Sequence, residues 1–149
     1  MRIFLSYARE DKAKAYAIAQ ALSPYHKVWA DWEDIPPGAD WRSEILKGII
    51  RSQFFIFLVS EHSTASPYCR EEVETALNFR KKVIPAIEDQ QILPERLARL
   101  QWVFVDEGNY EKGIRDLLSA LKPRPSRRWV YVALVEALII GVLLWRSYS

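Results

Sequence analysis

The sequence predicts an α/β fold of the flavodoxin type, in which a five-stranded parallel sheet carries helices on both faces, followed by a single C-terminal transmembrane helix. Two observations indicate this. Short apolar runs alternate with stretches in which apolar residues recur every three or four positions. Strands that alternate with helices imply right-handed crossovers, most simply in the strand order 2-1-3-4-5. The second observation is a long apolar segment near the C-terminus, 129–145.

The expected elements follow from these patterns in chain order. Apolar residues recur at helical spacing in 11–22, whereas 54–59 is apolar without alternation and too short for a helix, which is typical of a buried parallel strand. The full set of expected strands is 3–5, 28–30, 54–59, 83–87 and 102–105, and the expected helices are 11–22, 41–50, 68–79 and 110–121. We expect only a short helical turn in 88–100. Residues 1–121 then form one domain, a size that can bury a single core.

The C-terminal residues differ from this domain in composition. Two prolines in 122–128 stop the last helix and favour an extended linker. The next segment, 129–145, would span about 25 Å as a helix, slightly less than a hydrocarbon core of about 30 Å, and Arg128 and Arg146 can snorkel. Basic residues are more numerous before this segment than in the short tail 146–149, so the positive-inside rule places the domain in the cytoplasm. A buried or interfacial helix is the alternative.

One face of this C-terminal segment is suited to helix packing. Ala133, Ala137 and Gly141 repeat at four-residue spacing, and the only charged residue of the segment, Glu136, lies beside them. Because an ionisable group is costly inside a bilayer, association with another helix would relieve Glu136. We therefore expect self-association through this helix as well as membrane attachment.

Composition excludes several function classes. The net charge is only +2 and the basic residues form no stripe, so we expect no nucleic-acid partner. The single cysteine cannot form an intrachain disulfide, and no cluster has metal-ligand spacing, so we expect no metal. No glycine-rich phosphate loop follows a strand, which excludes a dehydrogenase or a P-loop enzyme. A phosphoacceptor receiver domain needs acidic residues where this chain has Ser6, Tyr7 and Ser60. The chain also begins without the apolar region of a signal peptide.

A ligand site is expected beyond the carboxyl ends of strands one and three, where the strand order reverses. Ser66 and Pro67 are a favourable N-cap and first residue for the helix that begins there. Two adjacent glutamates lie on this helix. At about 100° per residue Glu72 flanks the apolar stripe, about 80° from its centre, whereas Glu71 lies about 170° away and should be solvated. Glu72 is therefore the candidate carboxylate, although both can also be read as surface charges.

Four motifs resemble those of a TIR (Toll/interleukin-1 receptor) domain of bacterial type. They are 4–7 (Phe-Leu-Ser-Tyr), the loop 31–38 followed by Trp41, the strand end 58–60, and 66–73 around Glu72. This resemblance implies either a scaffold that assembles with other TIR domains or an enzyme that cleaves the nicotinamide–ribose bond of NAD. In the enzymatic branch a glutamate in the helix after strand three is catalytic, and Glu72 matches its position. Where the family commonly has Trp before Cys, this chain has Tyr68.

The resemblance also suggests roles for other residues. Tyr7 and Trp41 offer stacking faces, Arg9 a cation for pyrophosphate, and Asp31 an acceptor for a ribose or amide group. The remaining candidate substrate-binding residues are Ser6, Ser60 and Tyr68. Residues Asp34, Ile35, Pro36, Pro37 and Gly38 resemble the family's BB loop, which gates the site and contacts other domains. Tyr7, Trp41 and Arg9 also have ordinary readings as core or loop residues.

The functional prediction combines these points. We expect a membrane-anchored, single-pass TIR effector that cleaves NAD when oligomerised, as an NAD glycohydrolase or a related cyclase, in bacterial defence against phage. NAD would be its substrate, and no cofactor is expected. The alternative is a non-catalytic TIR adaptor that acts through contacts between TIR domains.

Overall fold

The computed structural model describes residues 1–30, 38–88 and 93–122. Several sequence predictions lie outside these residues. They concern Asp31, the loop residues Asp34, Ile35, Pro36 and Pro37, the linker beyond Lys122, the segment 129–145 with Ala133, Glu136, Ala137 and Gly141, and the tail 146–149. Within the described ranges, no helix is long and apolar enough to cross a membrane.

Five parallel strands form one sheet in the order β2-β1-β3-β4-β5, as the sequence predicts. The strands are β1 (Arg2–Ser6), β2 (Lys27–Trp29), β3 (Phe54–Val59), β4 (Lys82–Ile87) and β5 (Val103–Phe104). The order reverses between β1 and β3, so the expected switch point is confirmed.

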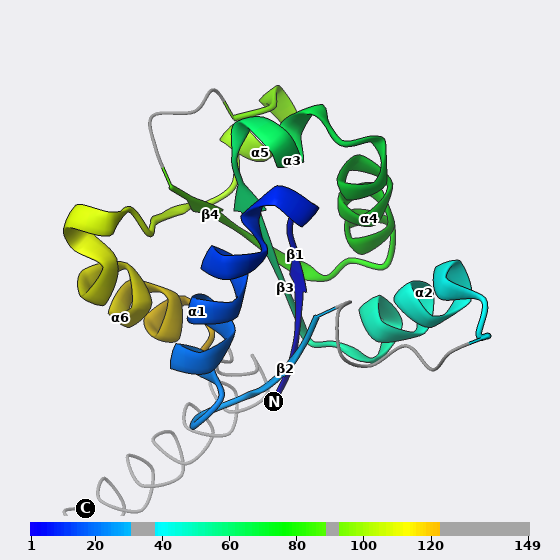
Figure 1. Ribbon diagram of the computed structural model, residues 1–149, viewed down its shortest axis with the longest axis horizontal. Helices are drawn as coiled ribbons and strands as arrows, with labels where there is room; N and C mark the ends of the chain where they lie inside the picture. The colour runs from blue at the N-terminus through cyan, green and yellow to red at the C-terminus, as the bar shows by residue number, and fades with distance from the viewer. Residues whose placement is uncertain (31–37, 89–92, 123–149) are drawn as a thin grey trace, which may run out of the picture.

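Helices cover both faces of this sheet (Figure 1). On one face lie α1 (Lys12–Leu22) and α6 (Tyr110–Ala120), and on the other α2 (Trp41–Arg51) and α4 (Pro67–Asn78). Shorter helices are η1 (Arg9–Asp11), α3 (Glu61–Ala65), α5 (Glu95–Ala98) and η2 (Glu107–Asn109). The predicted α/β fold with helices on both faces is therefore confirmed.

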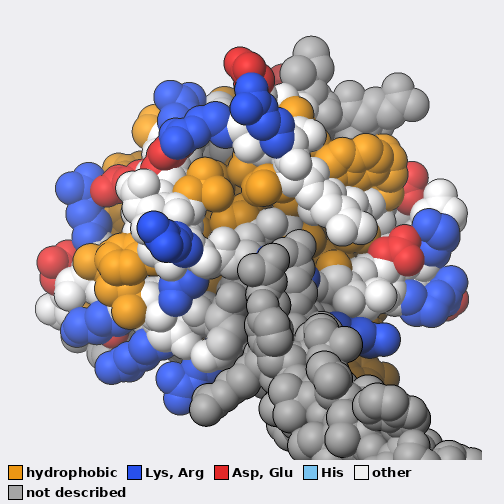
Figure 2. Space-filling view, turned by 180° about the vertical axis from the view of Figure 1, so that it is seen from behind, with side chains coloured by type: hydrophobic (Ala, Val, Ile, Leu, Met, Phe, Trp, Pro, Cys, Tyr) orange, Lys and Arg blue, Asp and Glu red, His pale blue; other side chains and the backbone are white. Residues whose placement is uncertain are grey.

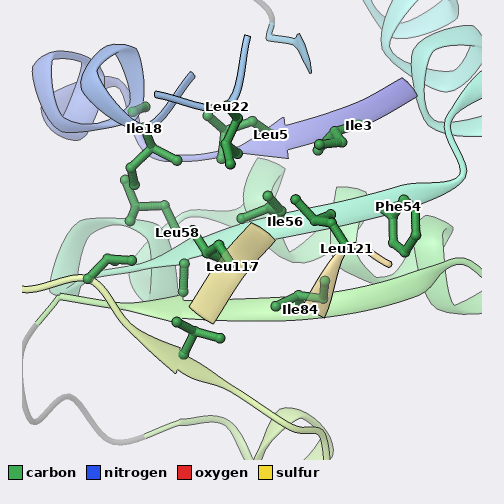
Figure 3. Packing of buried hydrophobic residues seen from close by; sticks show 14 of the residues in the cluster. Ile3, Leu5, Ile18, Leu22, Phe54, Ile56, Leu58, Ile84, Leu117 and Leu121 are labelled. Carbon is green, nitrogen blue, oxygen red and sulfur yellow. The ribbon is translucent and has the colours of Figure 1, made fainter. Parts of the chain in front are cut away.

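Strand β3 lies at the centre of the core and is buried along its whole length. Phe54, Ile56 and Leu58 belong to the hydrophobic cluster beneath α1 and α6, together with Leu117 and Leu121 (Figure 3). The intervening residues of β3 belong to the cluster beneath α2 and α4. Because successive strand residues point to opposite faces, a strand buried on both sides has the uninterrupted apolar sequence seen here.

The structure differs from the sequence prediction in its short helices and in the bounds of several elements. Helix α3 was not expected. It begins at Ser60, whose Oγ accepts a hydrogen bond from the Ser63 N–H while the Ser63 Oγ accepts one from the Ser60 N–H. Strand β2 begins and ends one residue earlier than expected, and β5 has two residues instead of four. The short helical turn expected in 88–100 is confirmed as α5.

Candidate functional site

A pocket of about 430 Å³ lies between α2 and α4. Both helices contribute residues from their first turns and from the turns that follow. The lining residues are Asp40, Trp41, Arg42, Ser43, Ile45, Leu46, Ile49, Tyr68, Glu71, Glu72 and Thr75. Its volume falls within the range of small-molecule sites, and its walls combine apolar, aromatic and charged groups.

A hydrogen bond joins Glu72 of α4 to the last residue of β1. The Ser6 Oγ donates to the Glu72 Oε2 at 2.5 Å. Ser6 shares its face of β1 with Phe4, which packs in the cluster beneath α2 and α4, and Ser6 is only 1% exposed. Glu72 itself is half-buried. A hydroxyl fixed in a strand therefore holds one oxygen of a carboxylate that faces the pocket.

The start of α4 determines which glutamate is held in this way. Ser66 is the N-cap, its Oγ accepts from the Cys69 N–H, and Pro67 is the first helical residue, as predicted. Cys69 and Val73 are buried on the side of α4 that meets the sheet. Glu72 is half-buried beside them, whereas Glu71 is exposed and lines the pocket. The helix geometry inferred from the sequence thus agrees with the structure.

Aromatic side chains from the two helix starts form one wall of the pocket. The rings of Trp41 and Tyr68 meet edge to face, with centroids 5.3 Å apart, and are 41% and 54% exposed. The Arg42 guanidinium lies over the Trp41 ring at 5.6 Å. The sequence analysis did not identify Arg42, although its place in the first turn of α2 is visible in the sequence. Exposed aromatic faces beside a cation can bind the flat rings and phosphates of a nucleotide.

The helix N-termini add a second electrostatic feature. Helix α2 begins after Asp40, whose Oδ1 accepts from the Arg42 N–H at 3.2 Å, and α4 begins after Ser66. Both first turns contribute to the pocket. The remaining N–H groups of each helix start carry partial positive charge, whereas the described lining residues include three acidic side chains, Asp40, Glu71 and Glu72, and one cation, Arg42.

Other predicted site residues lie on the opposite face of the sheet. Ser60 lines a second cavity, of about 750 Å³, and its Oγ donates to the Oδ2 of the buried Asp11. Tyr7 is buried in the cluster beneath α1 and α6. Ser60 directly follows β3 and continues the alternation of Phe54, Ile56 and Leu58, so it lies on the same face of the sheet as these residues. The polar groups expected in one crevice are therefore divided between two, and sequence reasoning missed Asp11 entirely.

Two further residues named in the sequence analysis, Arg9 and Gly38, do not line the candidate pocket. Arg9 is exposed in η1 and is not among the residues that line either cavity. Gly38 is the one residue of the BB-like loop that the structure describes, and its φ of 84° is a conformation that favours glycine. Among the described residues, no group of three or more His, Cys, Asp and Glu side chains could hold a metal ion.

The fold and the pocket define a doubly wound α/β domain in which a carboxylate of α4 is held by the last residue of β1 and faces a pocket between α2 and α4. Residues 3–118 match the sequence profile of the family described as "TIR domain". This match covers most of the chain, which therefore belongs to the TIR family. A comparison with curated proteins finds no match.

Solved structures share this fold. The TIR domain of the Toll-related receptor TRR-2 from Hydra magnipapillata is 18% identical, with a TM-score of 0.69, and the match covers 78% of this chain and 94% of that one. A TIR-STING receptor from C. gigas is 20% identical, with a TM-score of 0.67, and the match covers 81% of this chain but only 39% of that one. The CMP N-glycosidase BcmB from Clostridium botulinum is 17% identical, with a TM-score of 0.57 and coverages of 78% and 98%.

Proposed function

We propose that this TIR domain cleaves NAD at the bond between nicotinamide and ribose, with Glu72 as the catalytic carboxylate. The observation that carries the proposal is the hydrogen bond from Ser6 to Glu72 at the side of an aromatic-lined pocket. The TIR family includes NAD-cleaving enzymes. BcmB, which shares the fold, is named for cleavage of a nucleotide N-glycosidic bond, so the fold accommodates this class of reaction.

The chemistry requires one carboxylate and no acid. When the C–N bond of NAD breaks, both electrons move to the nicotinamide ring nitrogen, which loses its positive charge and leaves as a neutral molecule. The anomeric carbon of the ribose becomes electron-poor, and a carboxylate beside it stabilises the developing charge. Water then adds to that carbon and releases a proton. Glu72 supplies this negative charge, and the hydrogen bond from Ser6 fixes the position of its carboxylate.

The remaining pocket groups suit the rest of the substrate. Trp41 and Tyr68 provide aromatic faces for a ring, and Arg42 provides a cation. The partial positive charge at the starts of α2 and α4 adds to that of Arg42 for binding a pyrophosphate, against the repulsion of Asp40, Glu71 and Glu72 in the same lining. The volume of the pocket is in the range that binds small molecules.

Paired glutamate variants test the assignment. Purified protein is mixed with NAD, in dispersed and in clustered states, and free nicotinamide is measured. Glu72→Gln should abolish release with little change in melting temperature, whereas Glu71→Gln, the same substitution one residue away, should retain activity. The opposite result would reject Glu72. If the unaltered protein releases no nicotinamide in either state, the adaptor function becomes the better explanation.

We propose further that the chain is attached to a membrane and acts when clustered. The segment 129–145 has the composition of a spanning helix and is slightly shorter than a hydrocarbon core, and TIR domains as a class self-associate. Confinement to a membrane raises the local concentration of the domains, so weak contacts between them suffice. Through its resemblance to small bacterial TIR effectors, we assign the chain a role in antiphage defence by NAD depletion.

Three forms of the chain test this second proposal. They are the full chain, a chain ending at Lys122, and the full chain with Glu136→Leu and Gly141→Leu. Cross-linking and nicotinamide release should both fall in the second and third forms. Equal values in all three would make the C-terminal segment a passive tether.

A further inference from the structure

A basic groove with exposed aromatic residues lies at the β5 edge of the sheet, and none of its lining residues lines the candidate pocket. Strand β5 pairs only with Ala86 and Ile87 of β4, so the first residues of β4, beginning at Lys82, line a groove of about 860 Å³. Trp102 and Phe104 also line it. They meet edge to face with centroids 4.8 Å apart, and each is 41% exposed. Aromatic side chains with this exposure favour the boundary between water and lipid.

The charges of this groove are mainly positive. Lys82, Lys112 and Lys122 line it, and Asp116, paired with Lys112, is the one acidic side chain among the described lining residues. Lys81 lines it too, but its ammonium donates to the carbonyls of Ile50 and Ser52. Exposed hydrophobic side chains among lysines and arginines are also visible on the face of the molecule in Figure 2. A groove with this composition attracts the headgroups of anionic lipids more strongly than those of neutral lipids.

The short stretch of chain between the groove and the apolar segment favours a lipid surface as the occupant of the groove. Lys122 lines the groove, and the sequence continues with six residues, 123–128, before the apolar segment 129–145. Six residues and their flanking bonds span at most about 20–25 Å. If 129–145 lies in a bilayer, the groove is confined close to the lipid surface, and the connecting sequence 123–128 contains three further basic residues, Arg124, Arg127 and Arg128.

The groove lies at the β5 edge of the sheet, which β3 and β4 separate from β1. The Lys82 Nζ donates to the Ala120 carbonyl, which joins the start of β4 to the end of α6. Ser6 and Glu72 meet instead where β1 ends. Contact of the groove with a membrane therefore leaves the residues that line the pocket outside that contact.

From these observations we infer that the groove formed by Trp102, Phe104, Lys82, Lys112 and Lys122 docks on the anionic lipid surface of the membrane that holds the chain. This inference rests on the proposed membrane attachment and extends it. The tether would keep the domain near the bilayer, and the groove would fix its orientation there.

The experiment uses the full chain in nanodiscs, either of phosphatidylcholine alone or with about a third phosphatidylserine. Hydrogen exchange of backbone amides is followed in peptides that cover 101–105. We expect slower exchange only in the anionic discs, and a return to the neutral-disc rate at high salt, which screens surface charge. Lys112→Gln with Lys122→Gln should weaken docking about 25-fold, because each lysine near an anionic surface contributes about fivefold.

Controls separate the possible outcomes. Lys12→Gln with Lys47→Gln removes the same charge from α1 and α2, outside the groove, and should leave the protection unchanged. Trp102→Ser should weaken docking without releasing the chain from the disc. Glu72→Gln should dock normally, which separates this inference from the proposed catalysis.

Three results would overturn the inference. Equal protection in neutral and anionic discs that rises with the number of chains per disc would assign the groove to a second copy of the chain. Equal exchange in both kinds of disc, with the chain still bound, would leave the tether but remove the docking surface. Loss of the chain from both kinds of disc would show that the membrane attachment itself fails.

Discussion

Removal of the Ser6 hydroxyl tests whether the carboxylate must be held in place. In Ser6→Ala the Glu72 Oε2 loses a donor at 2.5 Å while the rest of the pocket is unchanged. A hydrogen bond to a charged group contributes about 1.5–3 kcal/mol, and each 1.36 kcal/mol corresponds to a tenfold change in rate. If the bond orients the carboxylate in the transition state, kcat should fall about 10- to 150-fold, with little change in KM.

The assay is nicotinamide release over a range of NAD concentrations, with thermal melting measured alongside. Ser52→Ala is the matched control, because Ser52 is also buried and its hydroxyl donates to a backbone carbonyl, that of Gly48, at the end of α2. Both variants should lose similar stability, and only Ser6→Ala should lose turnover. Full kcat in Ser6→Ala, together with an inactive Glu72→Gln, would show that Glu72 acts without this positioning residue.

Three further predictions concern stability and assembly. Gly113→Ala should destabilise the fold by about 1–3 kcal/mol in chemical denaturation, because the new Cβ would lie 2.2 Å from the Phe104 carbonyl oxygen, whereas Gly108→Ala, which meets nothing within 4 Å, should not. Gly38→Pro should block both self-association in light scattering and turnover, because proline cannot adopt the φ of 84°. Burial lowers the pKa of His26 below 6.5, so stability should fall as the pH drops below about 6.5, where the unfolded chain takes up the proton first. Urea unfolding at pH 7.5 and 5.5 should show this loss, and His26→Gln should reduce it.

Local sequence patterns predicted most of the fold because they carry its strongest physical signals. The uninterrupted apolar run of β3 reports burial on both faces, and the spacing of apolar residues in α1 reports one buried stripe. The lengths of β2 and β5 were less predictable. Both are edge strands with one neighbour each, so their ends depend on where that neighbour offers hydrogen bonds.

The candidate site was predictable only where one helix determines it. The cap at Ser66 fixes the register of α4, and helical geometry then separates Glu72 from Glu71. Which residue approaches Glu72 depends on the packing of α4 against β1, so the partnership with Ser6 had no local signal. The separation of Ser60 from this pocket did have a local signal. Side chains alternate between the two faces of the sheet along β3, and continuing that alternation past Val59 places Ser60 on the face of Leu58.

A second serine–carboxylate pair, Ser60 and Asp11, offers a contrast with Ser6 and Glu72. Ser60 caps α3 by accepting from the Ser63 N–H at 3.0 Å, and the same hydroxyl donates to Asp11, which is 5% exposed. This pair therefore joins the start of α3 to the start of α1 and has a structural role. Asp11→Ala leaves the Ser60 hydroxyl without its acceptor in the core, which costs about 1–3 kcal/mol.

Opposite effects are expected of the two carboxylates. Asp11→Ala should lower the melting temperature by several degrees and leave kcat per folded molecule nearly unchanged, because the pair lies on the face of the sheet away from the pocket. Glu72→Gln should leave the melting temperature nearly unchanged and abolish turnover. Melting curves and nicotinamide release measured on both variants at a temperature where each is folded would decide the matter. An inactive but fully stable Asp11→Ala would move the chemistry to the larger cavity, where Asp11, Lys14 and Glu88 would then be the residues to test.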